Sequence, residues 1–170
     1  MAAGVFDGQP TDWLKMELIE GELIEKMPQN RPHSIALAKG QRALSHAFAA
    51  DCYIAVQAPL QVDAESEPDA YADHPTGKDV RLVLEVSDTT PPHDRQIKTR
   101  LYARAGVPEY WILILKSRTL EVRRNPLPSP EDEQRWEYQT VQVLREDDSL
   151  MPLYAPDAAI RVADLLPDAG

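Results

Sequence analysis

A single carboxylate interrupts a run of aliphatic residues in the middle of this sequence. Val80 to Val86 reads VRLVLEV, and its one acidic residue is Glu85. A nearly continuous aliphatic run predicts a central strand that is buried on both faces of a sheet. A carboxylate there needs a cation, a proton or an opening to a cleft at the strand end. By its residue type, Glu85 fits a structural hydrogen-bonded acid and an acid of a functional site equally well.

A lysine follows at a position from which it could reach this carboxylate. The pattern from His93 to Ala105 predicts a helix, and Lys98 lies one turn into it. A lysine in the N-terminal half of this helix can lean back toward the end of the preceding strand. The alternative is that Lys98 is one of several solvated positions, beside Arg95 and Arg100.

Two buried strands and the helix between them must position both side chains. Glu109 to Leu115 (EYWILIL) is the second predicted buried strand, and Gly106 ends the helix before it. A helical connection between two strands of one sheet predicts that the strands are adjacent and parallel. Arg118 to Arg123 follows as a hairpin partner, which makes the fold class α/β. The side chains predicted to be buried here are Leu84, Val86, Leu101, Ile112 and Ile114.

Periodicity and breaking residues predict the remaining elements. They are a β-hairpin with strands near 16–19 and 22–27, a helix from His33 to Ala50, a strand from Tyr53 to Val62, an outer strand from Trp136 to Leu144 and a short helical turn within 160–166. Asp63 to Lys78 and Asn125 to Glu133 are acidic and contain several prolines, so we interpret both as loops. We expect one domain over residues 13–166, a flexible N-terminus of residues 1–12 and a tail of residues 167–170.

Several motifs occur together in an order that resembles a known family. They are the hairpin ELIEGELIEKMP, His33 at a helix start, Glu-Val-Ser-Asp from Glu85, Asp-Arg followed by Lys98, and LYARAGVPEYW from Leu101. In this order they resemble the Uma-two family of predicted bacterial endonucleases, which belongs to the PD-(D/E)XK superfamily. The resemblance covers roughly residues 13–166. It implies a restriction-endonuclease-like mixed sheet flanked by helices, with an N-terminal β-hairpin.

The resemblance also implies a metal-dependent endonuclease that hydrolyses phosphodiester bonds of DNA. Mapped by motif, Asp69 and Glu85 would bind Mg²⁺ or Mn²⁺, Lys98 would complete the catalytic site, and Glu22 would support it. Carboxylate oxygens suit these cations, which lower the pKa of bound water and offset the charge that develops on the scissile phosphate. For Glu22, an exposed strand glutamate is an equal alternative. A lone histidine such as His33 near a helix start is more often a cap or a surface group than a base.

The sequence departs from the family pattern where the first metal-binding acid is expected. The family has Pro-Asp followed by an aliphatic strand, whereas Pro68-Asp69 is followed here by Ala70-Tyr71-Ala72, which is no core strand. Either Asp69 takes this role from a loop, or the acid is missing and the chain is a degenerate or truncated member of the family. If Asp69 is not the ligand, Glu67 and Asp73 are the alternative carboxylates. A carboxylate moved from a strand to a loop is less preorganised. The alternative function is therefore a catalytically silent domain for binding or oligomerisation.

Charge and composition limit the partners. Eighteen basic and 28 acidic residues give a formal net charge of −10, so DNA binding would require a local basic patch or metal ions. The single cysteine, Cys52, excludes an internal disulfide, and no apolar run is long enough to span a bilayer. We therefore expect a cytoplasmic protein without a membrane partner. A homodimer is a further alternative, with the edge around Tyr110, Trp111 and Ile112 as its interface.

Overall fold

The computed structural model describes residues 16–19, 22–25, 30–48, 52–55, 76–88 and 92–168. Of these, residues 16–19, 22–25, 92–94 and 133–134 are described by their backbone alone. The predicted strand from Tyr53 to Val62 and the predicted loop from Asp63 to Lys78 lie largely outside these ranges. So do residues 1–12, for which we predicted a flexible terminus. Residues 52–55, which are described, are not part of a strand.

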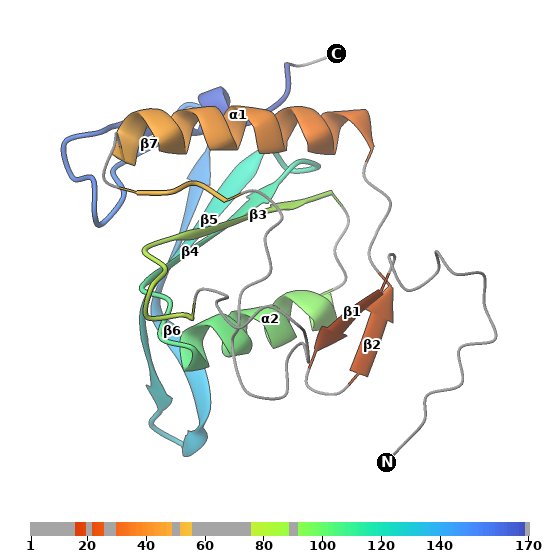
Figure 1. Ribbon diagram of the computed structural model, residues 1–170, viewed down its shortest axis with the longest axis vertical. Coiled ribbons are helices and arrows are strands. Elements are labelled where there is room, and N and C mark those ends of the chain that lie inside the picture. Colours follow the sequence, from red (N-terminus) through yellow and green to blue (C-terminus); the bar gives the residue numbers. More distant parts are fainter. Residues whose placement is uncertain are drawn as a thin grey trace.

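A mixed four-stranded sheet forms the middle of the fold (Figure 1). Its strands, in spatial order, are β3 (Val83–Ser87), β4 (Glu109–Ile114), β5 (Thr119–Ser129) and β6 (Asp132–Arg145). β3 and β4 are parallel, and the other neighbouring strands are antiparallel. The helix α2 (Pro92–Arg104) joins the two parallel strands. The predicted parallel crossover is therefore confirmed. Its physical reason is that only a long connection can return the chain to start a second strand in the same direction.

Helices cover both faces of this sheet, as Figure 1 shows. Helix α1 (Arg31–Phe48) lies on one face and α2 on the other. Successive strand residues point to opposite faces, so Trp111 and Leu113 join the buried cluster that includes α1, whereas Tyr110 and Ile112 join the cluster that includes α2. The result is the predicted α/β architecture of a mixed sheet flanked by helices.

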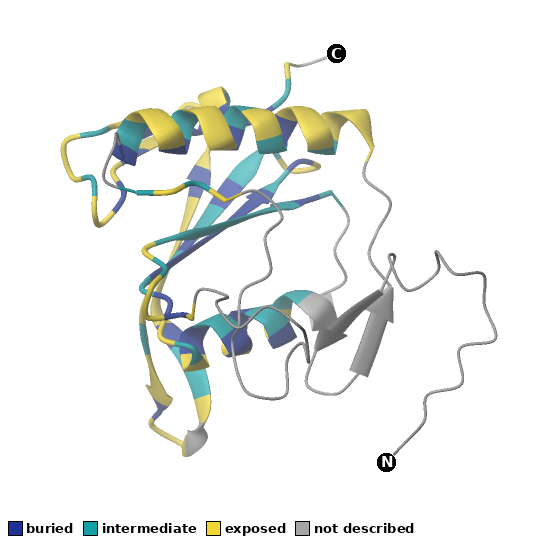
Figure 2. Cartoon of the chain, viewed as in Figure 1, coloured by how far each residue is buried: buried dark blue, intermediate teal, exposed yellow. Residues whose placement is uncertain are grey.

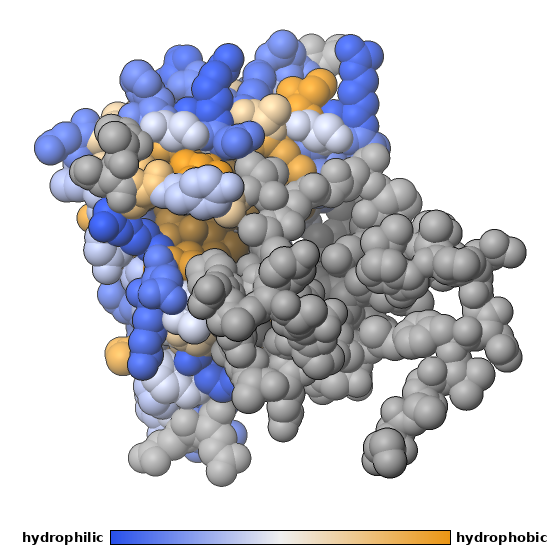
Figure 3. All heavy atoms as spheres, in the orientation of Figure 1, coloured by the Kyte–Doolittle hydropathy of each residue, from blue (hydrophilic) through white to orange (hydrophobic). Residues whose placement is uncertain are grey.

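The helix α1 buries only the side that faces the sheet (Figure 2). Its buried residues are Ala36, Gly40, Leu44 and Phe48, which follow each other at intervals of four, as one face of a helix requires. Its outer side carries mainly hydrophilic residues (Figure 3). At Gly40 the helix comes so close to β3 that an added Cβ would lie 2.7 Å from Leu84 Cδ2.

The helix α2 ends at a glycine, as the sequence predicts. Gly106 has a φ of 79°, a conformation that costs an L-residue with a side chain more than it costs glycine. The N–H of Gly106 donates to Ala103 O at 3.0 Å and the N–H of Val107 donates to Tyr102 O at 3.0 Å. This pair of bonds is a Schellman motif, which satisfies the last carbonyls of the helix and turns the chain into β4.

The strand β3 is less buried than its aliphatic sequence suggests. We expected a central strand buried on both faces, but four of its five residues are half-buried, and β3 is an outer strand of the described sheet. Leu84 and Val86 are therefore half-buried, as is Ile114, whereas Ile112 and Leu101 are buried as predicted. The difference arises because a strand at the end of a sheet has a neighbour on one side only.

The predicted loop from Asn125 to Glu133 is wrong. β5 continues through Pro126 and Pro128 to Ser129 and β6 begins at Asp132, so the two strands form one long hairpin. β4 pairs with β5 only as far as Arg124, and beyond it β5 has β6 as its one described neighbour. Where a strand has one neighbour only, every second residue does not need its N–H for pairing with another strand. Proline, which has no N–H, is tolerated in such a segment, and Pro126 and Pro128 lie in it.

The proposed dimer interface on β4 is also wrong. Tyr110, Trp111 and Ile112 are fully buried, because β4 lies between β3 and β5 and under both helical layers. These residues are core side chains and cannot contact a second copy of the folded chain.

The remaining elements are short. β1 (Met16–Ile19) and β2 (Glu22–Glu25) pair with each other in antiparallel register, as do β7 (Ser149–Leu150) and β8 (Ile160–Arg161). α3 (Val162–Leu165) is the predicted turn near the C-terminus. No helix in the described parts of the chain is long and apolar enough to cross a membrane.

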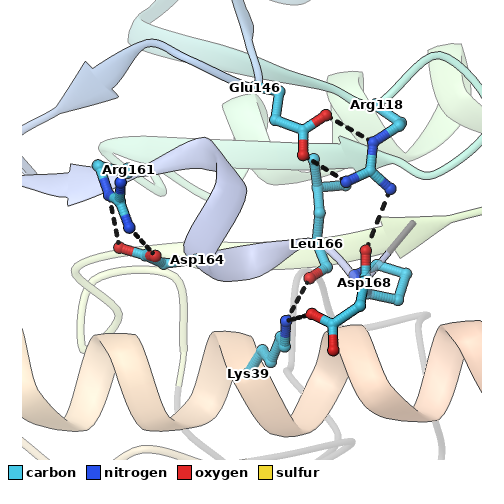
Figure 4. Close-up of polar contacts among 8 residues, drawn as sticks. Lys39, Arg118, Glu146, Arg161, Asp164, Leu166 and Asp168 are labelled. Carbon is cyan, nitrogen blue, oxygen red and sulfur yellow. Dashed lines mark hydrogen bonds and ion pairs between the residues drawn. The ribbon is translucent and has the colours of Figure 1, made fainter.

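Two basic side chains hold the segment after α3 (Figure 4). Lys39 Nζ of α1 donates to Leu166 O at 2.8 Å and pairs with Asp168 at 2.8 Å. Arg118, in the β4–β5 turn, donates to Pro167 O at 3.1 Å and pairs with Glu146. Residues 166–168 are thereby tied to α1 and to the sheet.

Candidate functional site

Glu85 lies in the middle of β3 and points into the layer between the sheet and α2. Leu84 and Val86, on either side of it, pack against the cluster on the α1 side, so alternation directs Glu85 to the opposite face. Its Oε1 accepts a hydrogen bond from the Tyr102 hydroxyl at 2.9 Å, and its Oε2 accepts one from the Tyr110 hydroxyl at 2.7 Å. The Glu85 side chain retains 26% of its exposure, so solvent reaches it.

Lys98 lies on α2 and faces the same carboxylate. Its Nζ is 3.5 Å from Glu85 Oε1, and its side chain is 19% exposed. The two side chains lie on the same side of the sheet, and the predicted contact between them is confirmed. The separation is that of an ion pair and is longer than a strong charge-assisted hydrogen bond.

Two tyrosines complete the surroundings of Glu85. Tyr102 and Tyr110 meet edge to face, with ring centroids 4.8 Å apart and ring planes at 65°. Burial, followed by the negative charge of Glu85, raises the pKa of Tyr110 well above its usual value. The phenol therefore stays protonated and remains a hydrogen-bond donor to Glu85.

Neither tyrosine was predicted as a site residue, although the sequence contains a signal for each. Tyr102 follows Lys98 by four residues, so both must lie on one face of α2. Tyr110 pairs with Val83 on the neighbouring strand, two residues before Glu85 and on the same face of the sheet. Once β3 and β4 are taken as parallel neighbours, the aromatic residue at the start of β4 becomes a candidate partner of Glu85.

The side chains of the other predicted site residues are not described by the structure. Glu22 begins β2, of which the backbone alone is described, and Asp69 lies outside the described ranges. Glu85 and Lys98 are therefore the two predicted site residues whose side chains the structure brings together.

His33 lies where the start of α1 meets the end of β3. The helix is capped by Asn30, whose Oδ1 accepts a hydrogen bond from the His33 N–H at 3.0 Å and whose Nδ2 donates to Asp88. Burial lowers the pKa of His33, and the charge of Asp88 opposes this shift. The cap is thus a neighbouring asparagine, and His33 contributes its backbone N–H.

A family model described as "Uma2: Putative restriction endonuclease" matches residues 6–163. The chain belongs to the Uma2 family. A solved structure, described as a putative nuclease belonging to DUF820 from Anabaena variabilis ATCC 29413, is similar to it with a TM-score of 0.61. The two chains are 14% identical, and the match covers 88% of each, so this likeness shows a shared fold. No curated protein matches the chain.

This Uma2 chain has a second charged group on the same face of the sheet, which the sequence analysis also missed. Glu121 of β5 pairs with Ile112 of β4, which in turn pairs with Glu85 of β3. The Glu121 carboxylate binds Arg95 of α2 at 2.9 Å and Arg123 of β5 at 2.8 Å. One end of α2 is therefore fastened to the sheet by Arg95, and Lys98 follows one turn later toward Glu85.

The oxygens of Glu85 are suitable ligands for a hard divalent cation, but they are already partly used. A carboxylate offers about four lone-pair positions, and Tyr102, Tyr110 and Lys98 approach three of them. Among the described residues, no group of three or more His, Cys, Asp or Glu side chains could hold a metal ion. A complete ligand set in this Uma2 protein would require a carboxylate from outside the described ranges, where Asp69 lies.

Proposed function

We propose that the protein is a metal-dependent endonuclease that hydrolyses phosphodiester bonds of DNA, with Glu85 and Lys98 at its centre. The observation that carries this proposal is the ion pair between these two side chains on one face of the sheet. An acid on a strand can bind a divalent cation, and a lysine within reach of it can stabilise charge on a phosphate. The chain also belongs to the family described as "Putative restriction endonuclease".

In this proposal Glu85 and Asp69 hold Mg²⁺ or Mn²⁺. When bound, the cation would lower the pKa of a water ligand and would offset the negative charge that develops on the phosphate. Lys98 orients the attacking water or stabilises the charge on the phosphoryl oxygens, because its ammonium group is held beside the ligand carboxylate. Glu22 is assigned a supporting role near the metal.

Tyr102 and Tyr110 are positioning residues in this proposal. Each donates to a different oxygen of Glu85, so the carboxylate plane is fixed from both sides. A carboxylate that is oriented before the cation arrives loses less entropy on binding and places the bound water more reproducibly. This arrangement supports a role of Glu85 as a ligand rather than as a flexible surface acid.

A plasmid-cleavage assay tests the proposal. We expect conversion of supercoiled plasmid in Mg²⁺ or Mn²⁺, no conversion with a chelator, and a loss of at least about 100-fold in rate for Glu85→Gln and for Lys98→Met. Glu131→Gln and Lys116→Met are the matched controls, because both residues are exposed and lie in turns between strands, outside β3 and α2. Cleavage that needs no metal, or that survives Glu85→Gln, would contradict the mechanism.

Asp69→Asn tests the role of the shortened segment. Loss of cleavage in this variant would support Asp69 as the second ligand, whereas full activity would assign that role to another carboxylate, such as Glu67 or Asp73.

Calorimetry with Mn²⁺ separates an inactive enzyme from a silent domain. A wild-type protein that neither cleaves DNA nor binds Mn²⁺ would favour the alternative function of a catalytically silent binding domain.

A further inference from the structure

One of the two edges of the described four-stranded sheet is formed by β6, and the other by β3. The backbone of β6 pairs with β5 on one side, and the structure describes no strand on the other. The stretch from Gln139 to Leu144 contains no charged residue and no proline. Val141 and Val143 within it are 51% and 58% exposed.

Such an edge is a template for another strand. Folded proteins commonly protect exposed edges with charges, prolines or bulges, because unpaired N–H and C=O groups bind other chains. The edge from Gln139 to Leu144 has β-branched residues in place of those protecting features. Its register with β5 is also continuous, from Thr140 opposite Arg124 to Arg145 opposite Thr119.

We propose that β6 pairs in antiparallel register with β6 of a second copy of this chain, around a two-fold axis at Val141. The axis places each Val141 opposite its symmetry mate, in the middle of the uncharged stretch. The resulting sheet would run continuously through both copies, and it would cover the exposed edge that each copy carries.

The charges at both ends of the stretch select this register. Glu137 and Arg145 lie four residues before and after Val141, so the axis places Glu137 opposite Arg145 of the second copy, twice in the dimer. Opposite charges on directly facing residues stabilise an antiparallel pair. Both lie on β6, and neither side chain has an ion-pair partner among the described residues.

The two neighbouring registers are disfavoured by the same charges. In a two-fold antiparallel pair, one residue faces its own symmetry mate. An axis at Thr140 would place Arg135 opposite Arg145, and these like charges would destabilise the pair. An axis at Gln142 would place Arg145 opposite the uncharged Gln139 and leave Glu137 beyond the end of the facing strand at Arg145, so this register gains no pair of opposite charges.

Sedimentation analysis of the full chain across a dilution series tests this proposal. We expect a species of twice the 19.1 kDa chain mass at the higher concentrations. Glu137→Arg and Arg145→Glu each place like charges opposite one another, and we expect each to raise the dissociation constant at least about tenfold. The double variant E137R/R145E restores opposite charges and should restore the dimer.

Two further variants complete the experiment. Asp157→Arg changes the net charge as much as Glu137→Arg does, at an exposed position outside β6, and should leave the dimer intact. Val141→Arg should abolish the dimer, because two arginines would face each other at the axis. Circular dichroism checks that each variant is folded. A wild-type chain that stays monomeric, or a double variant as weak as the single variants, would overturn the proposal.

Discussion

The hydroxyl of Tyr110 donates a 2.7 Å hydrogen bond to Glu85 Oε2 across the junction of the two parallel strands. Tyr110 is fully buried at the start of β4, whereas Glu85 is half-buried in β3. A core residue thus fixes the orientation of a solvent-accessible carboxylate. Because the core holds the tyrosine in place, the geometry of the candidate site depends on the packing beneath α2.

Removing this hydroxyl should affect stability and the candidate site together. We expect Tyr110→Phe to lower the free energy of unfolding by about 1–2 kcal/mol, since Glu85 loses a buried donor. If Glu85 is a metal ligand, the variant should also bind Mn²⁺ more weakly. Tyr138→Phe is the matched control, because it removes a buried hydroxyl that donates to Val107 O and not to Glu85. Urea denaturation and calorimetry measure the two effects, and equal Mn²⁺ affinity in both variants would exclude the positioning role.

Alkaline pH should destabilise the protein through its buried tyrosines. Burial raises the pKa of Tyr110 and of Tyr138, so each remains protonated in the folded protein at a pH where the unfolded chain has lost that proton. Their contribution is complete below about pH 10, and it then falls by about 1.4 kcal/mol per pH unit for each tyrosine. Urea denaturation at several pH values above 9 should show a shallower decline in Tyr138→Phe than in the wild type. Tyr154→Phe, which removes an exposed phenol, should decline as steeply as the wild type.

A buried carboxylate at the start of β4 should matter for stability. Glu109 is fully buried and accepts hydrogen bonds from Arg124 Nε at 2.8 Å, Trp111 Nε1 at 3.0 Å and the Leu153 N–H at 2.8 Å. We expect Glu109→Gln to cost about 3–5 kcal/mol, because it leaves Arg124 without its partner charge. Glu146→Gln, which breaks an exposed pair with Arg118, should be indistinguishable from the wild type in chemical denaturation. Similar losses in the two variants would argue that burial does not decide the effect.

The core on the α2 side should be sensitive to a cavity. Ile112 is 1% exposed and packs in the cluster with Tyr110. We expect Ile112→Ala to lower the free energy of unfolding by about 2–5 kcal/mol, through lost burial and the cavity left behind. Leu127→Ala, at an exposed position of β5, should change it by less than about 0.5 kcal/mol. A change within error at Ile112 would contradict its place in the core.

Local patterns were enough to predict the unit that carries the candidate site. The aliphatic runs, the helix between them and Gly106 predict β3, α2 and β4 in their observed order, and the length of the connection predicts their parallel pairing. Because Glu85 lies on β3 and Lys98 lies on α2, the next helix along the chain, their contact depends on short separations in the sequence. The contact between Glu85 and Lys98 is therefore largely determined by local sequence.

Features that depend on distant neighbours were decided by the tertiary structure alone. The half-burial of β3 depends on its outer place in the sheet, and the strand through Pro126 and Pro128 depends on where β4 ends. The sequence by itself determined the order of β3, α2 and β4, and it placed the acid on the first strand and the lysine on the helix. Only the folded chain decided that Tyr110 and Tyr102 bind Glu85 and that Arg95 and Arg123 share Glu121. The physical reason is that periodicity reports which face a residue occupies, whereas its partner is set by the strand or helix that packs against that face.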